Sequence, residues 1–87
     1  MKNDIDILKK KLIYRSQYRS TREMDKLIGN FVRTNIEKLN LNQLGELDEF
    51  LNYDDDILYR FYNKQISQNE LNNNYVFKLF KNYIYKE

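Results

Sequence analysis

The amino-acid sequence predicts an all-α fold, a small compact bundle of about five short helices. Two observations favour this fold class. Apolar residues recur at spacings of three and four along almost the whole chain, as on one face of a helix. Proline is absent and glycine occurs only twice, so few residues interrupt helices or shape hairpins. Because the chain has 87 residues, we expect one helical domain over residues 1–87.

The first two helices are predicted before residue 40. The spacing of Ile5, Leu8 and Leu12 favours a helix over about 4–14, and a longer amphipathic helix is predicted over about 21–38. The inward face of this longer helix contains Met24, Leu27, Ile28, Phe31, Val32, Asn35 and Ile36. Its opposite face carries the cations Arg22, Lys26 and Arg33.

Three further helices are predicted after residue 40. One runs over about 41–52, begins with the capping pair Asn40 and Gln43, and faces inward with Leu41, Leu44, Leu47, Phe50 and Leu51. A short helix over about 55–63 presents Ile57, Leu58, Phe61 and Tyr62. The last, over about 68–85, begins with Ser67 and Glu70 at capping-box spacing. Its apolar face contains Leu71, Tyr75, Leu79, Phe80 and Tyr83.

The residue types that are missing narrow the functions open to the chain. Cysteine and histidine are absent, which removes disulfides, thiolate metal sites and the commonest general base at neutral pH. No combination of nucleophile and base is visible, so we expect a protein that is not an enzyme. The run 54–56 of three aspartates lacks the glycine and closing glutamate of a calcium loop, and we interpret it as an acidic helix N-terminus.

Charge and hydropathy indicate a soluble cytoplasmic protein. The formal charge of +2 is smaller than that of dedicated nucleic-acid-binding proteins. No apolar run approaches the roughly 18 residues of a membrane span, and residues 1–6 lack the apolar segment of a signal peptide. We therefore expect neither nucleic-acid binding nor membrane insertion.

Arginine is concentrated in one short segment. Lysine is twice as common in the chain, yet Arg15, Arg19 and Arg22 lie within eight residues of one another. A guanidinium presents a planar fork of donors that matches carboxylates, which an ammonium does not. The cluster indicates either a site where the geometry of recognition matters or a solvated helix junction.

The run RSTREMD at 19–25 resembles the signature of the SdhE family, which is arginine-glycine-x-x-glutamate, an apolar residue and an aspartate. Residues 50–61, with an apolar pair, an acidic cluster, a leucine and an aromatic residue, are similar to the family's second block. The resemblance spans residues 8–64 approximately. Ser20 stands where the family has glycine, and Phe61 stands where it usually has tryptophan.

The serine in the signature has three interpretations. Ser20 and Glu23 have the spacing of a capping box, which predicts Ser20 as the N-cap of the long helix. Glycine is also accepted at an N-cap, so serine would be neutral or slightly stabilising there. If the position required a positive φ, serine would cost about 1 kcal/mol. If a partner's backbone approached closely, serine would lower the affinity.

The resemblance implies an assembly factor. Members of the SdhE family are small helical bundles that bind the flavoprotein subunit of succinate dehydrogenase, and often that of fumarate reductase. They promote covalent attachment of FAD to a histidine of this client. We therefore expect the chain to bind such a client, to hold no cofactor stably itself, and to be a monomer when free. FAD would be attached to the client.

The family signature also implies the residues that meet the client. The expected partner-binding residues are Arg19, Ser20, Arg22, Glu23, Asp25, Asp54 and Asp55. Arg19 would pair with a client carboxylate or carbonyl groups, and Glu23 with a client cation or amide. Alternatively, Glu23 serves only as a cap, and Arg22 only pairs with Asp25.

Other interpretations of this segment stay open at the level of sequence. Tyr14 and Tyr18, which flank the arginines, either line an interface or pack in the core. The alternative functions are a generic protein–protein adaptor and a nucleic-acid-binding helical module. The module would use Arg15, Arg19, Arg22 and Arg33.

Overall fold

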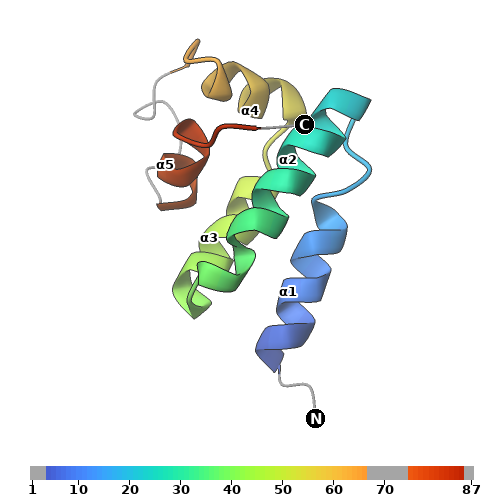
Figure 1. Ribbon diagram of the computed structural model, residues 1–87, viewed down its shortest axis with the longest axis vertical. Coiled ribbons are helices and arrows are strands. Elements are labelled where there is room, and N and C mark those ends of the chain that lie inside the picture. The colour runs from blue at the N-terminus through green and yellow to red at the C-terminus, as the bar shows by residue number, and fades with distance from the viewer. Residues whose placement is uncertain (1–3, 67–74, 86–87) are drawn as a thin grey trace.

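The computed structural model describes residues 4–66 and 75–85, and within these ranges it contains helices and no strands. The elements are α1 (Asp4–Arg15), α2 (Arg22–Asn35), the 3-10 turn η1 (Ile36–Lys38), α3 (Leu41–Leu51), α4 (Asp55–Tyr62) and α5 (Tyr75–Lys81). In Figure 1, α1, α2 and α3 run along the length of the molecule, α4 crosses one end of them, and α5 lies beside α3. The predicted all-α bundle is confirmed. No helix in the described ranges is long and apolar enough to cross a membrane.

Phenylalanine rings from three helices form the centre of the core. Phe31 of α2, Phe50 of α3, and Phe77 and Phe80 of α5 are each at most 1% exposed. The Phe50 ring centroid lies 5.1 Å from those of both Phe77 and Phe80, and 5.6 Å from that of Phe31. Tilted and edge-on packing of this kind suits the ring quadrupoles. Aromatic contacts therefore attach α5 to α2 and α3.

The long amphipathic helix is confirmed, with an earlier end than expected. Its predicted apolar residues are all buried. Asn35, the polar member of that face, is half-buried. Its Nδ2 donates to the Phe31 carbonyl at 2.9 Å, so the side-chain amide has a hydrogen-bond partner. The α-helix ends at Asn35, and 36–38 continue as a 3-10 turn, a common way for helices to finish.

The N-cap of α2 is Thr21, so the prediction of Ser20 as N-cap is wrong. The Thr21 hydroxyl accepts the Met24 N–H at 3.1 Å. Ser20 instead donates its backbone N–H to the Asp55 carboxylate at 2.6 Å. Because serine and threonine are adjacent, the helix could begin after either one. The bond between Ser20 and Asp55 of α4 favours Thr21 as the N-cap. Glu23 therefore lies in the first turn without the predicted capping box, and its side chain is exposed.

Two predicted inward-facing residues at helix starts are instead at the surface. The capping box of Asn40 and Gln43 is confirmed, and the rest of the predicted inward face of α3 is buried. Leu41, however, is 61% exposed because it lies one turn before the first core layer, at Leu44. Ile5, in the first turn of α1, is exposed for the same reason.

The last helix ends earlier than predicted and is turned about its axis. It ends at Lys81 instead of continuing to residue 85. The chain then folds back, with the Tyr83 hydroxyl donating to the Asn30 side chain and the Tyr83 ring packing on Phe31 at 5.3 Å. Residues 67–74, which include the predicted cap and Leu71, lie outside the described residues. The buried face of α5 comprises Val76, Phe77 and Phe80, while Tyr75 is exposed.

The cap assignment gives a direct test. We expect Thr21→Ala to lower the free energy of unfolding by about 1 kcal/mol, because the Met24 N–H loses its acceptor. Thr21→Ser keeps the hydroxyl and should stay within about 0.5 kcal/mol of wild type. Urea denaturation followed by circular dichroism measures both. Equal stability of the alanine and serine variants would contradict the assignment.

Candidate functional site

A partly buried ion pair joins the segment before α2 to the start of α4. Arg19 lies in the connection 16–21 between α1 and α2, and Asp55 is the first residue of α4. The Asp55 Oδ1 atom accepts from Arg19 Nε at 2.5 Å and lies 2.5 Å from Nη2. The two side chains are only 11% and 10% exposed. This arrangement is a charge-assisted, forked contact of the kind that arginine makes well.

The rest of the Arg19 guanidinium bonds to the last residue of α3 and to the connection that follows this helix. Nη1 donates to the Leu51 carbonyl at 3.3 Å, and Nη2 donates to the Tyr53 carbonyl at 3.1 Å. Carbonyl groups at a helix C-terminus carry partial negative charge and lack partners within the helix. Arg19 therefore connects the α1–α2 connection, the end of α3 and the start of α4 through one side chain.

Asp55 is held in its ionised form. Burial alone would raise the pKa of its carboxyl. Hydrogen bonds from the Ser20 backbone N–H, the Ser20 hydroxyl and Arg19, together with the guanidinium charge, outweigh burial and lower the pKa below its ordinary value. The carboxylate is thus charged at neutral pH, as the ion pair requires.

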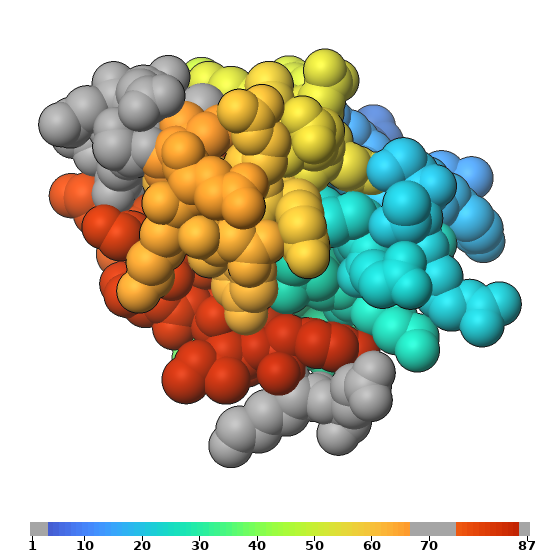
Figure 2. All heavy atoms as spheres, turned by 90° about the horizontal axis from the view of Figure 1, so that it is seen from above, coloured from blue at the N-terminus to red at the C-terminus, as the bar shows by residue number. Residues whose placement is uncertain are grey.

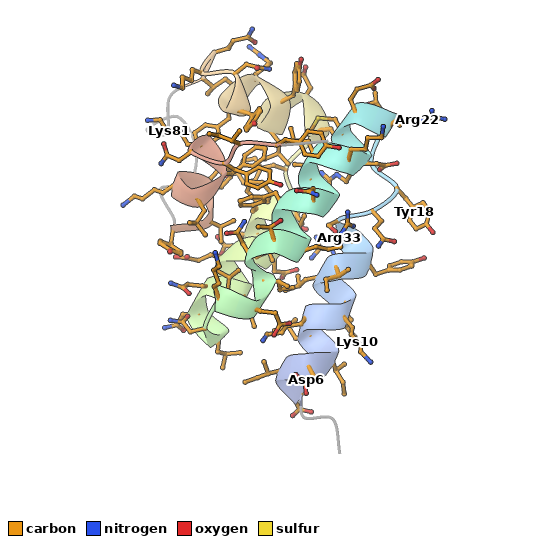
Figure 3. The ribbon with its side chains drawn as sticks, viewed as in Figure 1. Asp6, Lys10, Tyr18, Arg22, Arg33 and Lys81 are labelled. Atoms are coloured by element: carbon orange, nitrogen blue, oxygen red, sulfur yellow. The ribbon has the colours of Figure 1, made fainter. Side chains whose placement is uncertain are left out.

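A second aspartate fixes the backbone of the same segment. The Asp25 carboxylate accepts the backbone N–H of Arg19, six residues earlier. The alternative that Arg22 pairs with Asp25 is therefore not realised, and within the described residues Arg22 forms no ion pair. Figure 3 shows Arg22 projecting away from the bundle near the start of α2.

The backbone strain in the segment lies at Tyr18 and not at the serine. Among the described non-glycine residues, positive φ occurs at Tyr18 (59°) and Lys64 (63°). Ser20 has no such strain, so the interpretation that serine is costly at a positive φ is wrong. Tyr14 and Tyr18 are 67% and 78% exposed, with ring centroids 5.9 Å apart, which removes the alternative that they pack in the core.

Two hollows flank the ion pair. One, of about 440 Å³, is lined by Ser20, Thr21, Glu23, Met24, Asp55, Asp56 and Tyr59. The other, of about 650 Å³, lies toward α1 and the end of α3, and it shares Ser20, Asp55 and Asp56 with the first. Viewed from above, the start of α2 (cyan) lies beside α4 (yellow to orange), as Figure 2 shows. The ion pair therefore sets the shape of the surface between these helices.

The structure brings together four of the seven predicted site residues. Arg19, Ser20, Asp25 and Asp55 form one hydrogen-bonded network. Glu23 and Asp54 are exposed and line different hollows, while Arg22 points away. Asp54 is the N-cap residue of α4, although its side chain makes no capping bond.

Four residues that line the first hollow were not among the predicted site residues: Thr21, Met24, Asp56 and Tyr59. Tyr59 of α4 is 50% exposed and lines that hollow together with Glu23. Its position four residues after Asp55 places it on the same helix face, and this spacing could have identified it. Among the described residues, no group of three or more potential ligands is placed to hold a metal ion.

Comparison with known proteins gives one match. The model of the family Sdh5, described as flavinator of succinate dehydrogenase, matches residues 10–84. The matched range includes both segments that meet at the ion pair, 19–25 and 50–61. No curated protein and no solved structure matches the chain.

The ion pair has a consequence for stability. We expect Asp55→Asn to lower the free energy of unfolding at pH 7 by about 1–3 kcal/mol, because Arg19 loses its charged partner. The folded pKa of Asp55 lies below the ordinary value of 3.8, so its contribution is present above that pH and is lost as pH falls through the folded pKa. The difference between wild type and variant should therefore shrink on acidification, as urea denaturation from pH 7 to pH 3 would show.

Asp56 supplies the matched control for this measurement. It is the next residue in the same helix turn, its side chain is 76% exposed, and it lies 3.5 Å from Arg60. Asp56→Asn should change stability by no more than about 0.5 kcal/mol. Equal losses from the two variants would mean that the helix N-terminus, and not the pair with Arg19, is responsible.

Proposed function

The chain belongs to the Sdh5 family, the flavinators of succinate dehydrogenase, and from this we propose that it binds the flavoprotein subunit of that enzyme and promotes covalent attachment of FAD. One observation gives the main support for this proposal. The two segments that resemble the family's signature and second block meet at the Arg19–Asp55 ion pair and together line a hollow at the surface. The resemblance thus coincides with one continuous part of the molecular surface.

Hydrogen bonds within the chain hold Arg19 at the proposed binding surface. Arg19 is bonded to Asp55 and to two backbone carbonyls, so we assign it a positioning role in place of a direct contact with a client carboxylate. Glu23, which has no hydrogen bond or ion pair within the described residues, is free to accept from a client cation or amide. A surface ordered in advance lowers the entropy lost on binding.

In this proposal the flavin chemistry belongs to the client. The chain binds the flavoprotein and favours the client conformation in which the flavin and its acceptor side chain are aligned. The flavoprotein subunit of fumarate reductase is a second client of the same kind. The proposal also includes the expected cytoplasmic location and the expected monomeric state of the free protein.

The arginine contacts favour a protein client over nucleic acid. The nucleic-acid alternative needs four arginines directed at phosphates. Arg15 is bonded to Asp48 and Asn52, and Arg19 to Asp55, so two of the four already have partners within the chain. Arg22 and Arg33, the other two, supply little positive charge for binding a phosphate backbone.

Glu23→Ala is the sharpest test, because Arg19→Ala would disturb the fold as well. Apo-flavoprotein would be incubated with FAD and this protein, and covalent flavin would be read by fluorescence on a denaturing gel. We expect the wild type to accelerate attachment and Glu23→Ala to be slower by about fivefold or more at limiting protein, with unchanged stability. Glu37→Ala removes an exposed glutamate that pairs with Lys9 beyond the other end of α2, and it should match wild type in the rate of attachment. No acceleration by the wild type would refute the proposed function, whereas equal rates for wild type and Glu23→Ala would refute the role of Glu23.

A further inference from the structure

Two cations and an aromatic ring gather around a small hollow beside α2. The hollow has a volume of about 260 Å³ and is lined by Gln17, Tyr18, Asp25, Lys26 and Arg33. Four cations in the described residues, Lys9, Arg15, Arg19 and Arg60, pair with a carboxylate, and the others do not. Within the same ranges neither Lys26 nor Arg33 forms an ion pair. The feature that sets this hollow apart is that two unpaired cations line it together, next to an aromatic ring.

A glycine one turn earlier allows Arg33 to lie along the helix. A Cβ atom at Gly29 would lie 3.1 Å from Arg33 Nη1, closer than most contacts of that kind. Glycine in the middle of a helix costs about 1 kcal/mol relative to alanine, so its presence here needs a reason. Side chains of a helix lean toward its N-terminus, and the Arg33 guanidinium accordingly reaches back over Gly29 toward the turn of Lys26.

Tyr18 completes the hollow from the α1–α2 connection. Its backbone is in the left-handed region, which residues with a Cβ adopt at a cost, and its ring is 78% exposed. The hydrogen bond from the Arg19 N–H to Asp25 helps to hold the neighbouring backbone in place. Strained residues of this kind concentrate at binding sites. In Figure 3, Tyr18 and Arg22 project from the same side of the molecule, opposite Lys81.

We infer that this hollow binds a carboxylate side chain, aspartate or glutamate, on the surface of the client protein. The inference rests on the proposed function. Arg33 would donate its forked N–H groups and Lys26 its ammonium, while the Tyr18 ring packs against the apolar part of the acidic side chain. Asp25 also lines the hollow, so the local charge is close to +1 and suits one carboxylate better than a doubly charged phosphate.

The test measures the affinity for apo-flavoprotein at low and high salt. The double variant Lys26→Ala/Arg33→Ala should raise Kd about tenfold at 50 mM NaCl and lose most of its salt dependence, because exposed charge pairs are screened by salt. The control is Lys10→Ala/Lys81→Ala, which removes the same charge at exposed sites on α1 and α5 and should change Kd less than about twofold. Gly29→Ala, whose Cβ would shift the Arg33 guanidinium by a few tenths of an ångström, should raise Kd less than the double variant does, while leaving the melting temperature unchanged or higher.

The outcomes separate the inference from the proposed function. If the wild type binds the flavoprotein and the double variant binds it equally well at both salt concentrations, the inference is overturned and the proposed function stands. If the wild type binds no flavoprotein, the proposed function fails and the inference falls with it. Binding of a mixed-sequence DNA or RNA duplex that the double variant loses would assign the hollow to phosphates and would overturn the assignment of a carboxylate.

Discussion

The ion pair between Arg19 and Asp55 is the contact on which the rest of the site depends. It joins residues 36 apart in the sequence and aligns the connection before α2 with the start of α4. A partly buried pair is tolerated only when its remaining polar atoms find partners, and here the Ser20 N–H and the carbonyls at the end of α3 supply them. The hollows on either side, and the exposed position of Glu23, follow from this alignment.

Most of the fold could be predicted from the periodicity of apolar residues, because a helical face is a local property. The buried face of α2 and the capping box of Asn40 are examples, since both depend only on residues within a turn or two. The predictions of helix ends were wrong where a contact between residues far apart in the sequence sets the end of the helix. Asp55 takes the backbone N–H of Ser20, which moves the N-cap to Thr21, and the return of Tyr83 onto α2 ends α5 early.

The residues of the candidate site could be predicted from the sequence, but the contacts that they make with one another could not. The family resemblance pointed to Arg19 and to Asp55 as residues that face a partner, and nothing in the sequence shows that they bond to each other. The same limit applies to Arg33, which pattern analysis places only on the polar face of its helix. Its guanidinium lies 3.1 Å from the place that a Cβ atom of residue 29 would occupy, and this proximity is visible only in three dimensions.

The aromatic core has a consequence for how the chain is made. Phe31 and Phe50 are synthesised well before Phe77 and Phe80, the rings of α5 that cover them. A nascent chain that has reached only α4 therefore exposes two large rings to water, with no later segment yet available to shield them. Completion of this core must therefore wait until α5 has left the ribosome.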